Sequence, residues 1–404
     1  MEACAMSSTF ETLKARDNAA VCSTYGRYPL AVARAKGSRL WDLDGREYVD
    51  LLSGIAVTSL GHGHPEVVEV IKAQADKLIH VSNLFYQQEQ VALAERLLST
   101  CTAGRVFFCN SGAEANEAAC KLARRAMRTV RGRDAYEIVT LSGSFHGRTL
   151  AMVAATGQAK FKQGFEPMPE GFVTAPWGDI EALAATINER TAGVLVEIVQ
   201  GEGGIRPMAA EYAQAVQRLC RERGVLFMVD EVQAGLCRTG RFWAHQHFDL
   251  TPDVFTTAKA LANGLPMGAM MASSEIACGF VPGTHATTFG GGALVAAAAD
   301  KVVEIMQRDR LDERAAELGS YAQGLFRDMA KACPGKVREV RGMGLMIGIE
   351  LDFPGAEIWK SLLDQGFVCN LTQDKVLRLL PALTIDRADL DAFAQTLTEL
   401  LRSV

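Results

Sequence analysis

Lys259 stands in an unusual setting for a lysine. It follows the largely apolar stretch 254–258 and precedes the apolar stretch 260–262. Most lysines are solvated surface charges, and that is the ordinary interpretation of the residue type. Apolar neighbours on both sides disfavour exposure here, and a desolvated lysine has a lowered pKa and attacks carbonyl carbons. The sequence therefore predicts a nucleophilic amine at position 259.

Asp230 follows the apolar stretch 225–229 and precedes Glu231. A carboxylate at the end of a buried strand is costly unless it meets a cation or hydrogen-bond donors. One interpretation is an aspartate that caps the next turn, which is common. The other is an anion that keeps a heteroaromatic ring nitrogen protonated, as a pyridinium requires.

The segment from Asn110 to Asn116 is built of small and polar residues and opens a predicted helix. Backbone N–H groups at Ser111, Gly112 and Ala113 can approach a phosphate, and a helix N-terminus favours its charge. Taken alone, an ordinary N-cap is the better interpretation. The chain has no GxxxxGK[ST] motif and no complete dinucleotide glycine pattern, so a phosphate bound here would belong to another ligand.

The lysine, the aspartate and the helix N-terminus together point to one ligand. A phosphate cradle upstream, an acid at one strand end and a lysine two elements later are the set that pyridoxal phosphate requires. Phe145 could stack on a flat ring, and Arg148 could hold a carboxylate, although a packed loop phenylalanine and a surface arginine are the ordinary alternatives. His245 and His247 form an HxH pattern, but no acid or cysteine stands nearby at metal spacing, so no metal site is expected.

The elements that must position these residues alternate between short apolar strands and amphipathic helices from about residue 80 to 300. This pattern predicts an α/β fold with a mostly parallel sheet, in which ligands lie beyond the carboxyl ends of the strands. Strands are expected at 105–109, 136–141, 193–199, 225–229 and 253–257, and helices at 113–125, 211–223 and 388–401. Two further strands are expected at 39–42 and 48–51, around an Asp44-Gly45 turn.

Composition limits the function classes. The formal net charge of −5 disfavours a nucleic-acid surface, which would need a basic face. No apolar run reaches the ~18–20 residues that cross a bilayer, and acids at 2, 11 and 17 argue against a signal peptide. Ten scattered cysteines without a CxxC pair predict reduced thiols in the cytoplasm, with those at 109, 120, 220 and 369 buried.

Several blocks of the sequence, in this order, resemble the class III pyridoxal-phosphate aminotransferases over nearly the whole chain. The blocks are 24–27 (TYGR), 53–57 (SGIAV), 61–65 (GHGHP), 110–116, 144–149 (SFHGRT), 200–204 (QGEGG), 230–233 (DEVQ), Lys259 and 287–291 (TTFGG). The resemblance implies a fold type I transferase: a large domain with a mostly parallel sheet flanked by helices, plus a smaller α+β domain from the two chain ends. We expect residues 1–75 to belong to the small domain, 76–305 to form the large cofactor-binding domain, and 306–404 to form the C-terminal small domain.

The resemblance also implies residue roles. Lys259 corresponds to the lysine that holds the cofactor as a Schiff base, Asp230 to the pyridinium partner, and Gln233 to the residue beside the phenolic oxygen. The other implied cofactor contacts are Ser111, Gly112, Ala113, Phe145, Val232 and Thr288, the last reaching the cofactor of the neighbouring subunit in a homodimer. The implied substrate contacts are Tyr25, Arg148, Glu202, Thr287 and Arg378, with Glu202 masking Arg378 for one substrate and releasing it for the other.

The family members that this chain resembles most move the side-chain amino group of N2-acetylornithine to 2-oxoglutarate, a step of arginine biosynthesis. The departures are Gly292-Ala293, where the family usually has Asn-Pro beside the phosphate, and Ala382, where it usually has a second proline. Three alternatives stay open. They are a sister ω-aminotransferase (for ornithine, succinylornithine, succinyldiaminopimelate, 4-aminobutyrate or carrier-bound lysine), a racemase or aminomutase on the same scaffold, and an inactive binding protein.

Overall fold

A computed structural model describes residues 9–404 of the chain. Residues 1–8 lie outside the described part. They include Glu2, one of the three acids that predict the absence of a signal peptide. The strands are β1 (Val32–Lys36), β2 (Arg39–Asp42), β3 (Glu47–Asp50), β4 (Arg105–Cys109), β5 (Glu137–Leu141), β6 (Phe172–Ala175), β7 (Thr191–Glu197), β8 (Val199–Gln200), β9 (Arg206–Pro207), β10 (Leu226–Asp230), β11 (Val254–Thr257), β12 (Gly268–Ala272), β13 (Val337–Met343), β14 (Met346–Leu351), β15 (Phe367–Val368), β16 (Asn370–Thr372) and β17 (Val376–Leu379).

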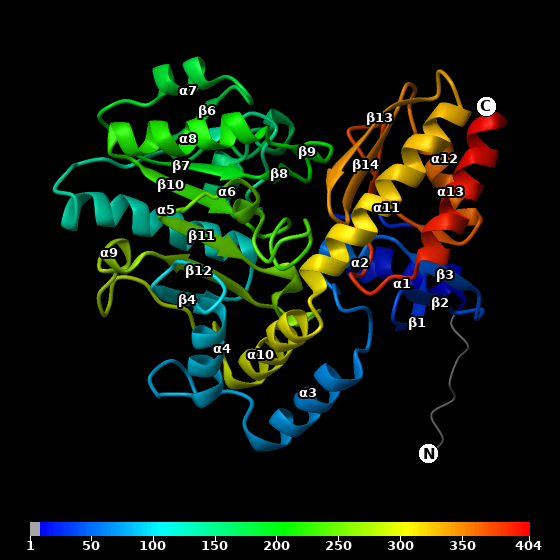
Figure 1. The fold of residues 1–404 in the computed structure, drawn as a ribbon. Helices are drawn as coiled ribbons and strands as arrows, with labels where there is room; N and C mark the ends of the chain where they lie inside the picture. The colour runs from blue at the N-terminus through cyan, green and yellow to red at the C-terminus, as the bar shows by residue number, and fades with distance from the viewer. Residues whose placement is uncertain (1–8) are drawn as a thin grey trace.

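The helices fall between these strands and at the chain ends (Figure 1). They are α1 (Phe10–Ala20), α2 (Ser53–Ala56), α3 (Pro65–Lys77), α4 (Gln88–Leu98), α5 (Gly112–Thr129), α6 (Leu150–Ala155), α7 (Ile180–Thr186), α8 (Ala210–Arg223), α9 (Ser274–Ala277), α10 (Ala293–Arg308), α11 (Leu311–Ala332), α12 (Ala356–Asp364) and α13 (Arg387–Arg402), with the short 3-10 helices η1 (Ala159–Phe161), η2 (Ala244–Phe248) and η3 (Lys259–Ala262).

A seven-stranded sheet forms the larger half of the molecule, with the order β4-β12-β11-β10-β7-β5-β6. Its central pairs, β11-β10, β10-β7, β7-β5 and β5-β6, are parallel, whereas β12 runs antiparallel to both of its neighbours. Strands β5, β7 and β10 are buried along their whole length, as strands covered on both faces must be. The predicted mostly parallel α/β sheet is therefore confirmed.

Most expected elements lie within two residues of their observed bounds. Helix α8 ends where expected, because Gly224 adopts a left-handed conformation with φ of 62° and closes the last turn. The strand expected at 193–199 was placed too late, since β7 ends at Glu197. The chain then turns away, and β8 pairs with β9 in a separate two-stranded ribbon. The helix expected at 113–125 was ended too early, since α5 continues to Thr129, and no bounds were predicted for α1 to α4, α6, α7 or α9 to α12.

Two smaller sheets form the other half of the molecule. The order β1-β2-β3-β15 joins strands from both chain ends, and the order β13-β14-β17-β16 carries α11, α12 and α13 beside it (Figure 1). The expected domain boundaries at 75 and 305 fall inside α3 and α10, which pack against each other. Since a helix is a continuous and rigid element, we propose that the domain boundaries lie at the ends of these two helices.

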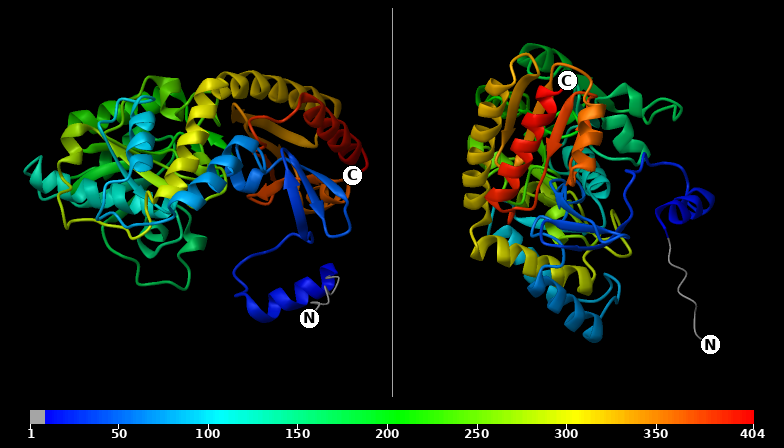
Figure 2. Two further views of the ribbon diagram at one scale, coloured as in Figure 1. Left: turned by 90° about the horizontal axis from the view of Figure 1, so that it is seen from below. Right: turned by 90° about the vertical axis from the view of Figure 1, so that its right-hand side faces the viewer.

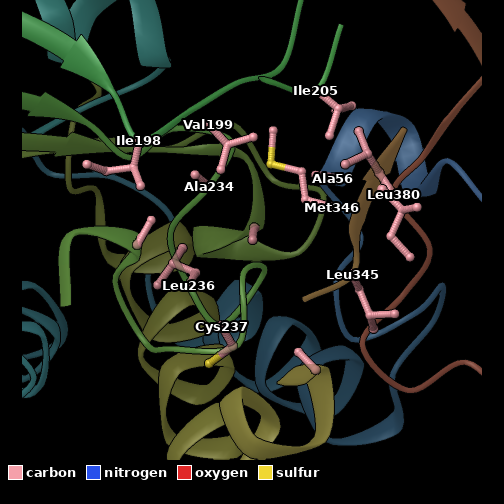
Figure 3. Close-up of a cluster of buried hydrophobic side chains, with 14 of the residues drawn as sticks. Ala56, Ile198, Val199, Ile205, Ala234, Leu236, Cys237, Leu345, Met346 and Leu380 are labelled. Carbon is pink, nitrogen blue, oxygen red and sulfur yellow. The ribbon is translucent and has the colours of Figure 1, made fainter. Parts of the chain in front are cut away.

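A continuous apolar core connects the two halves. Figure 3 shows side chains from three separate parts of the chain meeting there: Ala56, then Ile198, Val199 and Leu236, then Leu345, Met346 and Leu380. Each is no more than 2% exposed. Helix α1 differs, because it has no buried residue and stands apart from the rest of the protein (Figure 2, left). Among the described residues, no helix combines the length and apolar character needed to span a membrane.

Candidate active site

A cavity of about 420 Å³ lies beyond the carboxyl ends of the parallel strands. It collects most of the residues that the sequence singled out, although they come from five separate segments of the chain. Its lining includes Ser111, Gly112, Ala113, Phe145, Arg148, Glu202, Asp230, Val232, Gln233 and Lys259. Each of them ends a strand, follows one or begins a helix, which is where the strand pattern predicted the chemistry.

Lys259 begins the 3-10 helix that follows β11. Its φ of 43° is left-handed, a conformation that costs free energy for a residue with a side chain. The buried flanking residues Ala258 and Ala260 hold it there. Burial lowers the pKa of the Lys259 amine, although the charges of Glu202 and Asp230 oppose that shift. A larger share of neutral amine at neutral pH is what a nucleophile needs.

Asp230 ends β10 and is held from three sides. Its Oδ2 accepts hydrogen bonds from Asn116 Nδ2 and His146 Nδ1, both at 2.8 Å, and its Oδ1 accepts one from the backbone N–H of Val232 at 3.0 Å. Since an ionised carboxylate only accepts, the proton of the histidine bond lies on Nδ1. Asn116 is fixed in turn, because its Oδ1 accepts a bond from Thr256 Oγ1 at 2.7 Å. The network orients a buried anion toward the cavity.

The N-terminus of α5 forms one wall of the cavity. Ser111 caps the helix, since its Oγ accepts a bond from the backbone N–H of Glu114 at 3.1 Å. The capping interpretation is thus correct, and it leaves the N–H groups of the first turn available to an anion. Gly112 packs so closely that an added Cβ would lie 2.7 Å from Val232 Cγ1. The wall combines close approach of the backbone with the positive end of an 18-residue helix.

Glu202 and Arg378 are 176 positions apart in the sequence and form an ion pair, with 2.5 Å between Oε1 and Nη1. Arg378 lies on β17 and its side chain is 2% exposed. Its Nε and Nη2 also donate to Oδ1 of Asn370, at 3.0 and 2.7 Å. Burial, the largest single influence, raises the pKa of Glu202, but the charge of Arg378, its hydrogen bond to Glu202 and the charge of Lys259 act together against it, and the net pKa is lowered. The pair is therefore charged at neutral pH.

Phe145 and Arg148 lie at the cavity edge. The guanidinium of Arg148 sits over the rings of Phe161 and Phe145, at 4.3 and 5.4 Å from their centroids. Stacking of this kind positions an otherwise exposed arginine without neutralising it. A cation with this freedom can meet a carboxylate that enters from solvent.

The structure does not bring every predicted residue to the cavity. Thr287 is adjacent to it, since its Oγ1 accepts a bond from Asn110 Nδ2 at 3.2 Å. Thr288 is exposed and does not line the cavity of its own chain. Tyr25 is 73% exposed and lies beside α1, again outside the cavity. Within one chain, Thr288 and Tyr25 therefore do not line the cavity that contains Lys259 and Asp230.

Sequence reasoning missed Glu197. It faces Asp230 across the β7–β10 register, lines the cavity, and its Oε2 accepts a bond from the backbone N–H of Phe145 at 3.1 Å. Burial, and then the neighbouring charge of Asp230, raise the pKa of Glu197 well above its usual range. An acid at the end of an otherwise apolar strand was the signal that could have identified it. His146 and Asn116 lay inside recognised blocks without an assigned role.

The donor set fits a ligand with an anionic end and a flat ring. The α5 N-terminus suits a phosphate, and the fixed carboxylate of Asp230 suits a protonated ring nitrogen. The Oε1 atom of Gln233 is buried at the cavity without a hydrogen-bond partner among the described residues, so it is available to a polar group of a ligand. The depressed pKa of Lys259 suits attachment to an aldehyde carbon. Pyridoxal phosphate has all four of these features.

Comparison with known proteins agrees with this geometry. Residues 21–401 match the family described as Aminotransferase class-III. The chain is 44% identical over 380 residues to the acetylornithine aminotransferase of Methanocaldococcus jannaschii, covering 94% of this chain and 95% of that one. Its fold is similar to that of Toxoplasma gondii ornithine aminotransferase, a structure with partial occupancy of PLP at the active site (TM-score 0.94, 30% identity, 98% and 95% of the two chains). It is also similar to the acetylornithine aminotransferase of Elizabethkingia anophelis (TM-score 0.88, 28% identity, 98% and 100% of the two chains).

Proposed function

The chain belongs to the class III aminotransferases, which depend on pyridoxal phosphate, and we propose that it transfers the side-chain amino group of N2-acetylornithine to 2-oxoglutarate. The products are N-acetylglutamate 5-semialdehyde and glutamate, and the reaction belongs to arginine biosynthesis. The relatives named acetylornithine aminotransferase, at 44–45% identity over more than nine-tenths of the chain, support this substrate.

The observation that carries the proposal is the pairing of Glu202 with Arg378 at a cavity that also holds Arg148. The acceptor has two carboxylates, whereas the donor has one carboxylate and a distant amine. Two accessible arginines suit the acceptor. One accessible arginine, with the second arginine masked by Glu202, suits the donor. A switchable ion pair lets one cavity serve both halves of the reaction.

The protein's own residues then have distinct tasks in the proposal. When bound, pyridoxal phosphate supplies the carbonyl carbon that exchanges with amines and the electron sink for the substrate carbon. Lys259 would hold it covalently through Nζ, and once released, Nζ would accept the proton from the amine-bearing carbon of the substrate. Asp230 would hold a proton on the ring nitrogen. Phe145 would cover the ring and exclude water, and the α5 N-terminus would bind the phosphate.

The proposal extends to assembly. Thr288 and Tyr25 stand outside the cavity of their own chain, and the exposed helix α1 buries none of its side chains. This supports a homodimer in which Thr288 reaches the cofactor of the neighbouring subunit and Tyr25 meets substrate. The described cysteines are all free, which supports a reducing compartment such as the cytoplasm.

An amino-donor screen tests the substrate assignment. Glutamate formation from 2-oxoglutarate is measured with N2-acetylornithine, ornithine, N2-succinylornithine and 4-aminobutyrate at matched concentrations. We expect the highest kcat/KM with N2-acetylornithine. A higher kcat/KM with unacylated ornithine would reassign the enzyme to the ornithine aminotransferases. This is the specific alternative, because the fold is similar to that of an ornithine aminotransferase.

A further inference from the structure

A second cavity, of about 850 Å³, lies on the far side of the turn that carries Glu202. It is open to solvent and sits where the β8–β9 ribbon meets β13 and α11, between the two halves of the molecule (Figure 1). We call it the ribbon groove. Its charged and aromatic lining residues are Trp177, Arg206, Arg327, Glu339, Arg341, Glu350 and Lys375.

The ribbon groove has an excess of positive charge. Its two carboxylates are already engaged, because Glu339 and Glu350 both bind Nη1 of Arg341, at 2.7 and 2.5 Å. Arg206 and Lys375 have no ion-pair partner among the described residues. Within residues 9–404, Arg327 bonds only to the uncharged Gln323 of its own helix, at 3.0 Å. Three cations that have no counter-charge among the described residues therefore face one concave surface, and its four cations and two carboxylates give a formal net charge of +2.

We propose that the ribbon groove binds a small organic dianion with two carboxylates. Arginine and lysine side chains gathered in a hollow repel one another, and an anion between them relieves that repulsion. Trp177, whose ring lies 5.6 Å from the guanidinium of Arg206, offers an apolar surface to the carbon chain of the ligand. The flanking Glu339 and Glu350 and the overall charge of −5 disfavour a long polyanion such as a nucleic acid.

The ribbon groove is connected directly to the Glu202–Arg378 pair. Gln373 donates from Nε2 to the backbone oxygen of Glu202 at 2.6 Å, and Arg341 donates from Nη2 to the backbone oxygen of Gly204 at 2.7 Å. Arg206 closely follows Glu202 and Gly204 in the sequence, and Lys375 lies between Gln373 and Arg378. A dianion that bridges Arg206 and Lys375 would clamp together the two segments that carry the pair.

Clamping favours the paired state of Glu202 and Arg378. The ligand should then hinder the half-reaction with 2-oxoglutarate more than the half-reaction with the amine donor. This consequence rests on the proposed function, whereas the binding site itself does not. Since coupling between two sites is reciprocal, opening the pair should weaken binding in the ribbon groove.

Calorimetric titration of the holoenzyme with succinate tests the binding site. We expect two succinate sites per chain in the wild type, one in the catalytic cavity and one in the ribbon groove. The double variant Arg206→Glu/Lys375→Glu should lose one of them, or bind there at least tenfold more weakly. Lys331→Glu is the matched control, because Lys331 is on the same helix as Arg327 and pairs with Asp328 away from the ribbon groove. Arg206→Gln/Lys375→Gln is the milder variant if charge reversal impairs folding.

A wild-type titration in which no succinate site depends on Arg206 and Lys375, or an equal loss in Lys331→Glu, would overturn the proposal. Titration with inorganic sulfate separates the ligand classes, and sulfate binding as tight as that of succinate in the ribbon groove would overturn the assignment to a dicarboxylate. The coupling has its own readout. Glu202→Ala should weaken succinate at the second site, and an unchanged affinity there would remove the coupling while leaving the site and the proposed function intact.

Discussion

The ion pair between Glu202 and Arg378 is the contact whose removal tests the two-substrate argument most directly. Glu202→Ala deletes the carboxylate but leaves Oδ1 of Asn370, which accepts two hydrogen bonds from the guanidinium. Arg378 should therefore stay in its position behind Glu202 with its charge uncompensated. The α-carboxylate of either substrate can then bind it.

The size of the effect follows from the burial of the two partners. Arg378 is 2% exposed, but the Glu202 side chain is 27% exposed toward the cavity, so the pair is intermediate between buried and exposed. Losing one partner of a fully buried pair costs about 3–5 kcal/mol, and an exposed pair contributes about 0–1 kcal/mol. We take about 2 kcal/mol for the interaction that an uncovered Arg378 offers to a misplaced carboxylate of the donor, which corresponds to about 30-fold in rate at ~1.4 kcal/mol per tenfold.

The expected result is asymmetric between the two half-reactions. The half-reaction with 2-oxoglutarate should be kept or accelerated, because Arg378 no longer has to be released. The half-reaction with N2-acetylornithine should slow by about 30-fold, because the open arginine draws the α-carboxylate and presents the wrong nitrogen. Single-turnover absorbance changes of the bound cofactor measure each half separately. Glu202→Gln should behave in the same way, since it removes the charge and keeps the size of the side chain.

The reasoning fails if both half-reactions slow equally in Glu202→Ala. That outcome would mean that Glu202 only stabilises the glycine-rich turn. Retention of normal donor kinetics in Glu202→Gln would also contradict a role for the charge.

Three further outcomes follow from the same cavity. Asp230→Asn should lower turnover by several orders of magnitude with the fold kept, and circular dichroism beside steady-state kinetics checks both; activity within a few-fold of wild type would contradict the role. Burial lowers the pKa of Lys259 in the folded state, so this lysine costs stability below its unfolded pKa of about 10.4. Cofactor-free Lys259→Met should therefore unfold at a higher temperature at pH 7, lose this advantage as the pH approaches 10, and be inactive. The raised pKa of Glu197 means that its stabilising contribution is complete below an unfolded pKa of about 4.3 and is lost as the pH rises through the folded value. Urea unfolding of Glu197→Gln should show a stability gain over wild type that grows from pH 4 toward neutrality, and a pH-independent difference would refute the assignment.

Much of this molecule could be predicted from local patterns. Alternating apolar strands and amphipathic helices identified the parallel sheet, because burial on both faces makes the central strands continuously apolar. The position of Lys259 between two apolar stretches and of Asp230 at a strand end pointed to the cavity, since parallel strands bring their carboxyl ends to one edge. The glycine at 224 marked the end of α8 through its left-handed conformation. The recognised blocks then indicated the family, which the comparisons confirmed.

Local patterns failed where the structure depends on weak or distant signals. Helix α1 has little amphipathic character and buries nothing in its own chain, so periodicity could not identify it. The strand expected to continue to residue 199 ends at Glu197, because tertiary pairing with β9 redirects the chain. Glu197 was overlooked, since an acid within an apolar strand acquires meaning only when its neighbour across the sheet is known to be Asp230.

What the sequence determined by itself is the set of reacting groups and the elements that carry them, because side-chain chemistry and hydrophobic period are properties of the chain at short range. What only the tertiary structure decided is which distant groups meet. Glu202 and Arg378 come together because β17 of the C-terminal sheet packs against the turn that follows β8, across 176 positions. Contacts at that separation depend on how the two halves of a protein pack against each other, and the sequence of neither segment alone specifies that packing.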